Sequence, residues 1–191
     1  MSPRMRLVLR DQWDDSAIAG VFSDNGCRFI GEEAGDRHSP RQLLWERGRA
    51  RFHYVEDPIT GLRFLMVAGE EVEQEVGWLE QRFEPLSREE IVDRFARARS
   101  PEDKAAAMFL AAVSASPDSL DPEVFSLLHE GLKDGDPYVR FQAVGAMSYL
   151  GWVEFLPSLE QLRDGDPDEQ VSDVAEGLIE LLAQTRRQSG A

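Results

Sequence analysis

The chain has 191 residues and a formal net charge of −15, from 21 Lys and Arg against 36 Asp and Glu. This charge repels phosphate backbones and anionic lipid, so nucleic-acid and membrane partners are not expected and a basic protein partner is favoured. The single cysteine, Cys27, excludes an internal disulfide, and the longest apolar runs are too short for a signal peptide or a membrane span. A soluble cytoplasmic protein is therefore expected.

Residues 1–85 are expected to form a small α+β domain, an antiparallel sheet with two helices. Runs of branched and aromatic residues predict strands at residues 5–10, 27–30, 51–55 and 62–67. The last two flank Asp57-Pro58-Ile59-Thr60-Gly61, which predicts a hairpin turn. Helices are expected at residues 40–47 and 70–83, the second with apolar residues at helical spacing and Pro85 after its end.

Arginines cluster in the middle of this first domain, at positions 37, 41, 47, 49 and 51. A run of glutamates follows at positions 70, 71, 73 and 75. Opposite charges at this density favour ion pairs between the two groups, within the chain or across a dimer contact. Anion binding by the arginines is the alternative.

Residues 86–184 are expected to form an all-α domain of about three helix pairs, followed by a disordered tail at residues 185–191. The expected pairs are residues 87–98 with 101–115, 122–132 with 137–150, and 153–162 with 168–184. Proline is tolerated in the first turn of a helix, and a preceding Ser or Asp can cap the free N–H groups there. Ser100-Pro101 and Asp121-Pro122 therefore each start a helix.

One short motif occurs twice in this second half. Asp134-Gly135-Asp136-Pro137 recurs as Asp164-Gly165-Asp166-Pro167, and each copy is followed by apolar residues at helical spacing. A unit of about 30 residues that restarts in this way is typical of an α-solenoid, in which helix pairs bury their apolar faces by stacking.

The first copy resembles a known repeat. Asp136-Pro137-Tyr138-Val139-Arg140, followed by Ala143 and Leu150-Gly151, resembles the HEAT repeat, in particular the short variant of phycobilisome-lyase-like bacterial proteins. The resemblance implies that Arg140 pairs with aspartates at the turns between helices, forming a ladder along the solenoid. The candidates are Asp134, Asp136, Asp164 and Asp166. The third pair departs from the pattern, because Ser172 stands where an arginine is expected.

Catalytic and metal-binding patterns are lacking. The three histidines are scattered without metal-ligand spacing, and hydrolase, Walker and dinucleotide-binding motifs do not occur. Asp134-Gly135-Asp136 lacks the further acidic ligands of a calcium loop, so helix capping explains it better. No cofactor, metal or enzymatic activity is expected.

Aromatic residues line one face of the helix that follows the first motif. Phe141, Gly145 and Tyr149 are spaced by four, Trp152 follows the helix, and Tyr138 precedes them. In HEAT-like solenoids the second helices line the concave face, so these aromatics are candidates for binding a partner. The alternative is that Phe141 and Trp152 pack against neighbouring repeats.

An acidic ridge follows on the last helix, formed by Glu169, Asp173, Glu176 and Glu180 at steps of four, three and four. It would attract a basic partner if it faces the concavity. The alternative is a solvated face that caps the stack.

The favoured function is a non-catalytic protein-interaction scaffold, one form of which is an immunity-type antidote that masks a basic toxin or enzyme. The resemblance also implies an alternative, a bilin-lyase-like or chaperone-like enzyme subunit. A homo-oligomer is compatible with either function.

Overall fold

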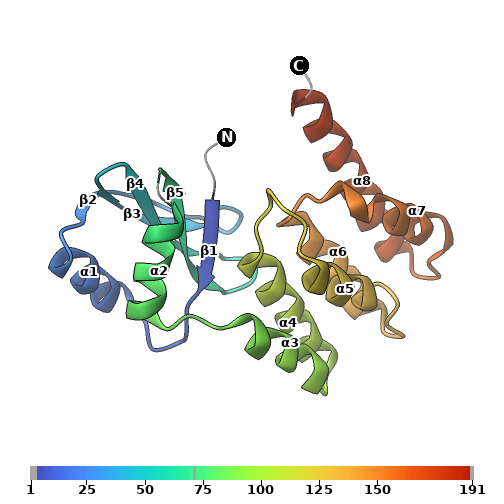
Figure 1. The fold of residues 1–191 in the computed structure, drawn as a ribbon. Helices are drawn as coiled ribbons and strands as arrows, with labels where there is room; N and C mark the ends of the chain where they lie inside the picture. The colour runs from blue at the N-terminus through green and yellow to red at the C-terminus, as the bar shows by residue number, and fades with distance from the viewer. Residues whose placement is uncertain (1–3, 71, 190–191) are drawn as a thin grey trace. The chain divides into compact units, whose positions relative to one another are not determined.

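The structure is a computed structural model that describes residues 4–70 and 72–189. Its internal contacts divide the chain into two compact units, Met1–Arg88 and Glu89–Ala191. The first unit contains strands and two helices, and the second contains helices (Figure 1).

The first unit is built on a five-stranded antiparallel sheet. Its strands are β1 (Arg4–Val8), β2 (Arg28–Glu33), β3 (Arg41–Arg47), β4 (Ala50–Glu56) and β5 (Arg63–Gly69), in the spatial order β1-β5-β4-β3-β2. Two helices, α1 (Asp15–Asp24) and α2 (Val72–Phe83), accompany the sheet. This confirms the expected fold class, and the hairpin predicted around Asp57 is the β4–β5 connection.

The core of this unit lies between one face of the sheet and the two helices. Alternate residues of the central strands are buried on this face, including Leu43, Trp45, Phe52, Tyr54, Leu65 and Val67. Phe22 of α1 is fully buried among them, with its ring centroid 4.7 Å from that of Trp45, 5.2 Å from that of Phe52 and 5.8 Å from that of Phe83 of α2. Phe22 therefore joins α1, α2 and the sheet.

The helix expected at residues 40–47 is wrong, because this segment is strand β3. Leu43 and Trp45 are buried and their neighbours are half-buried, which is the period-two pattern of a strand with one face in a core. β3 joins β4 through a two-residue turn at Gly48-Arg49, where Gly48 has a φ of 59°. Glycine adopts this left-handed conformation without the steric cost that other residues meet.

Helix α1 was not expected from the sequence. It begins after Asp14, whose carboxylate accepts a hydrogen bond of 2.9 Å from the backbone N–H of Ala17. The buried side chains of Ile18 and Phe22 lie one turn apart on the face toward the sheet. The cap and this spacing are the two features of the sequence that indicate the helix.

The arginine cluster forms ion pairs within the first unit. Arg47 pairs with Glu75 and Arg49 with Glu70, as the charge pattern predicts. Arg41 instead pairs with three carboxylates, those of Asp15, Glu32 and Glu56. Glu71 lies outside the described residues.

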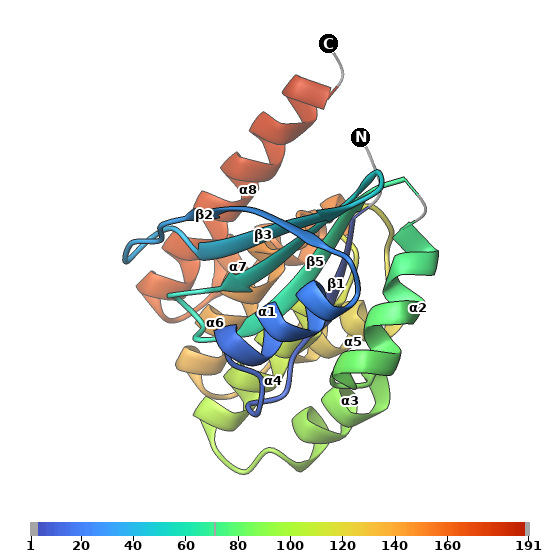
Figure 2. The same ribbon diagram turned by 90° about the vertical axis from the view of Figure 1, so that its left-hand side faces the viewer.

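The second unit consists of three successive helix pairs, which confirms the solenoid architecture. The pairs are α3 (Arg88–Arg97) with α4 (Pro101–Ser114), α5 (Pro122–Gly131) with α6 (Pro137–Ser148), and α7 (Leu156–Gly165), preceded by the 3₁₀ turn η1 (Val153–Phe155), with α8 (Glu169–Ser189). Residues 185–189, expected in a tail, continue the backbone of α8. α6 packs between α4 and α8, so the second helices of the three pairs form one layer (Figures 1 and 2).

Candidate protein-binding surface

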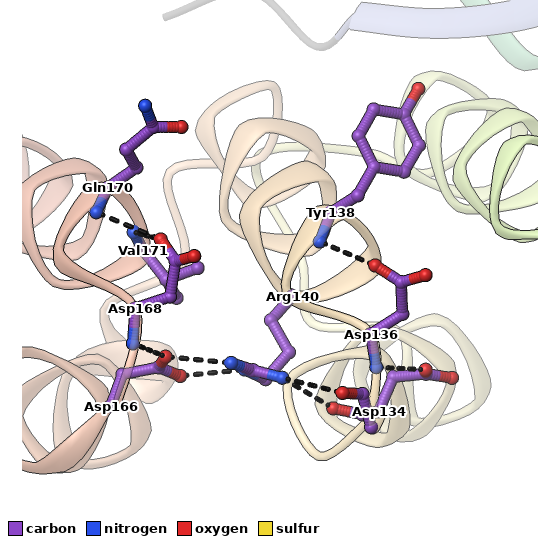
Figure 3. A network of polar contacts seen from close by, with 9 residues as sticks. Asp134, Asp136, Tyr138, Arg140, Asp166, Asp168, Gln170 and Val171 are labelled. Carbon is purple, nitrogen blue, oxygen red and sulfur yellow. Dashed lines mark hydrogen bonds and ion pairs between the residues drawn. The ribbon is translucent and has the colours of Figure 1, made fainter.

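The second helices of the pairs are tied to one another by a buried arginine. Arg140 of α6 is 8% exposed, and its Nε and Nη2 donate to the two carboxylate oxygens of Asp166 at 2.7 and 2.8 Å. Its Nη1 donates to the carbonyl oxygens of Asp134 at 2.9 Å and Gly135 at 3.3 Å. Figure 3 shows the guanidinium between the turn before α6 and the turn before α8. Arg140 therefore fixes the spacing of these two helices.

A second cation makes the equivalent contact one pair earlier. Lys104 of α4 pairs with the carboxylate of Asp134, which also accepts a hydrogen bond of 2.9 Å from the backbone N–H of Asp136. Lys104 stands four residues after Ser100, the N-cap of α4, and Arg140 stands four residues after Asp136, the N-cap of α6. The ion pairs Lys104–Asp134 and Arg140–Asp166 are therefore two successive rungs of one ladder. Lys104 could have been identified from the sequence by its place four residues after the N-cap.

The two copies of the sequence motif have different roles in the structure. Asp168 accepts hydrogen bonds from the backbone N–H groups of Gln170 and Val171 at the start of α8, which Asp136 does for Tyr138 at the start of α6 (Figure 3). Asp166 accepts from the N–H of Asp168 at 2.9 Å, as Asp134 does from Asp136.

The second copy of the motif therefore lies two residues earlier, relative to the helix that follows it, than the first copy does. Asp166 corresponds in the structure to Asp134, and Asp168 corresponds to Asp136. The carboxylate of Asp164 pairs with the adjacent Arg163 and not with Arg140. Four residues after Asp168 stands Ser172, which carries no cation. The ladder therefore ends at α8.

The aromatic residues of α6 differ in exposure. Tyr138 is 43% and Phe141 36% exposed, whereas Tyr149 is half-buried. Phe109 of α4 lies beside Tyr149 and Gly145, because its ring is 5.8 Å from that of Tyr149 and its Cζ lies 3.3 Å from where a Cβ on Gly145 would stand. Phe109 therefore occupies the gap left by Gly145, and the aromatic surface continues from α6 onto α4. Phe109 was not among the residues predicted to bind a partner.

Trp152 belongs to the core of the second unit. Its side chain is 4% exposed and stacks on Phe155, with ring centroids 5.7 Å apart. Its Nε1 donates to the carbonyl oxygen of Ser116 at 3.2 Å. This geometry agrees with the second interpretation of Trp152, that it packs against neighbouring repeats. Its side chain is not available to a partner.

The four acidic residues of the predicted ridge are exposed on α8, the helix that packs against α6. Glu169, Asp173, Glu176 and Glu180 are all solvent-accessible, and no ion pair within the described part of the chain engages them. Phe141 and Asp173 each stand five residues after the N-cap of their helix, so they occupy equivalent positions on neighbouring helices. We name the set Tyr138, Phe141, Glu169, Asp173, Glu176 and Glu180 the α6–α8 face.

The second unit thus combines three helix pairs with capped turns and with a cation at the same position in two successive pairs. The family model for HEAT repeats matches residues 89–180. Residues 89–180 are HEAT repeats. HEAT repeats are generally protein-interaction scaffolds and are typically not enzymes. No curated protein and no solved structure gives a significant match to the chain.

Within residues 4–70 and 72–189, no helix is long and apolar enough to cross a membrane. In the same residues, His, Cys, Asp and Glu side chains do not gather in any group of three or more that could hold a metal ion.

The ladder of the HEAT repeats predicts a loss of stability in acid. Hydrogen bonds from Arg140 hold the pKa of the Asp166 carboxyl below its usual range, and Lys104 does the same for the pKa of Asp134. A carboxylate with a lowered pKa in the folded state contributes stability above its unfolded pKa of about 3.9, and this is lost as the pH falls through the folded value.

We therefore expect the free energy of unfolding to decrease as the pH is lowered below about 4. The difference in this free energy between the wild type and Asp166→Asn should shrink over the same pH range. Urea denaturation at pH 6, 5, 4 and 3 measures both quantities. A constant difference between the two proteins down to pH 3 would contradict the assignment of the ladder.

Proposed function

We propose that the HEAT repeats form a non-catalytic module that binds a basic protein partner through the α6–α8 face. The observation that carries the proposal is that α6 bears exposed aromatic rings and that α8, which packs against it, bears four exposed carboxylates that form no ion pair within the described residues. The family supports a protein partner, since HEAT repeats are generally scaffolds.

The two halves of this face would contribute differently to binding. Aromatic side chains supply a large contact area at a small cost in conformational entropy, and truncating such a residue at the centre of an interface costs about 2 kcal/mol or more. Exposed charges at the rim mainly raise the association rate and discriminate against unsuitable partners. The aromatic residues should therefore determine affinity, and the acidic ridge should determine the preference for a basic protein.

The experiment is a quantitative pull-down with the tagged full chain from a lysate of the source cell, at low and moderate salt. We expect one enriched basic protein whose capture falls more than about tenfold with Tyr138→Ala/Phe141→Ala. With Asp173→Lys/Glu180→Lys we expect a loss that is largest at low salt, because salt screens exposed charges.

Matched controls separate this face from the rest of the HEAT repeats. Leu120→Ala removes an exposed apolar side chain between α4 and α5, and Glu123→Lys/Glu130→Lys reverses two exposed charges on α5. Capture should survive both controls, and circular dichroism should show the same helix content in every variant. Absence of any enriched protein, or equal losses in controls and α6–α8 variants, would reject the proposal.

A further inference from the structure

Strand β2 forms one edge of the five-stranded sheet and is exposed along almost its whole length. It pairs with β3 on one side and with no other strand of the described residues. Phe29 is 52% and Ile30 36% exposed, so two consecutive apolar side chains of this edge strand are open to solvent. In Figure 2, β2 runs along the side of the sheet that faces the viewer. An edge of this kind offers backbone N–H and C=O groups to another strand.

A bulge in β2 determines which side chains share a face. Arg28 lies opposite Glu46 and Phe29 opposite Trp45, but Gly31 follows opposite Leu44, so Ile30 is an extra residue. In a regular strand, residues five positions apart point to opposite faces. The extra residue shifts the alternation of faces by one position. Arg28, opposite Glu46, and Glu33, opposite Gln42, therefore point to the same face of the sheet.

This arrangement makes β2 complementary to itself. If two copies of β2 pair antiparallel about a two-fold axis between Ile30 and Gly31, Arg28 of each copy lies opposite Glu33 of the other, on the same face. Opposite charges that face each other across two strands stabilise the pairing. The symmetry produces this ion pair twice.

The residues nearest the axis also fit. Ile30 of each copy lies opposite Gly31 of the other, and an atom placed at the Cβ position of Gly31 meets no other atom within 4 Å. Ile30 can therefore cover this glycine. Arg28 is exposed over 71% of its side chain, so its ion pair with Glu46 contributes little and does not hold it away from a second copy.

We propose that β2 is a homodimer interface, through which two copies of this chain join their sheets into one continuous sheet. The inference is independent of the function proposed for the HEAT repeats, because it concerns only the first unit. A six-residue strand pair is smaller than the interfaces of obligate dimers, so a reversible dimer with a dissociation constant of roughly 10 µM is expected.

The test uses two variants, each of which reverses one charge of the Arg28–Glu33 pair. Arg28→Glu places like charges opposite each other at both sites of the dimer, and Glu33→Arg does the same with opposite sign. Each variant alone should dimerise more than tenfold more weakly than the wild type in analytical ultracentrifugation at 1–200 µM. An equimolar mixture of the two should recover the dimer, because glutamates of one variant then face arginines of the other.

Recovery in the mixture cannot arise from altered contacts within one chain, so it reports the contact between copies. Arg49→Glu is the matched control, since it reverses an exposed charge on the β3–β4 turn that pairs with Glu70 and not with a residue of β2, and it should dimerise like the wild type. A wild type that stays monomeric at 200 µM would overturn the proposal. So would a dimer that both single variants leave unchanged, or a mixture no more dimeric than its components.

Discussion

Arg140→Ala is expected to lower the free energy of unfolding of the HEAT repeats by about 3–5 kcal/mol. The substitution removes both hydrogen bonds to Asp166, whose side chain is only 3% exposed, and leaves that carboxylate buried without its partner. Two backbone carbonyls, those of Asp134 and Gly135, lose their donor as well. Urea denaturation at pH 7, followed by far-ultraviolet circular dichroism, measures the change.

Arg163→Ala is the control for this prediction. Its guanidinium pairs with the neighbouring Asp164, which is exposed over 67% of its side chain, so the free energy of unfolding should change far less than with Arg140→Ala. If the two alanine variants are equally stable, Arg140 does not hold the repeats together. The double variant Arg140→Met/Asp166→Leu should recover part of the lost stability, because it leaves no unpaired charge.

Phe22→Ala is expected to destabilise the first unit by about 3–5 kcal/mol. The ring is fully buried and contacts aromatic residues of β3, β4 and α2, so its removal leaves a cavity at the point where α1 meets the rest of the core. Domains of this size are commonly stable by only about 5–15 kcal/mol, so the loss is a large fraction of the total. Tryptophan fluorescence during urea denaturation reports it, because Trp45 and Trp78 contact the ring.

The control for Phe22 is Ile59→Ala. Ile59 is 67% exposed in the β4–β5 turn, and its truncation should change the stability by less than about 0.5 kcal/mol. A loss below about 1 kcal/mol for Phe22→Ala would show that α1 is not anchored to the sheet as described.

The sequence predicted the helix pairs well because their boundaries have local causes. Ser100, Asp121 and Asp136 each cap a helix whose first residue is proline, and these short patterns act regardless of what the helix later packs against. The hairpin around Asp57 has a local cause too, since its carboxylate accepts hydrogen bonds from Ile59 and Thr60 within the turn.

Elements whose identity depends on distant contacts were missed. The adjacent leucines of residues 41–47 suit a helix locally, and only pairing with β2 and β4 makes the segment a strand. The displaced second motif was interpreted by sequence identity, so Asp164 was assigned to the ladder while Asp168 and Lys104 were not. Periodicity likewise could not identify Trp152 as buried, because Trp152 lies beyond the end of α6 and its burial depends on packing against Phe155.

The measurement that most directly tests binding through the α6–α8 face is photo-cross-linking from single positions in the source cell. A photoreactive phenylalanine analogue replaces Phe141 in one protein and Leu120 in another, both exposed positions in the second unit. We expect position 141 to cross-link to one basic protein and position 120 not to cross-link to it. Cross-links to the same proteins from both positions, or none from position 141, would contradict it.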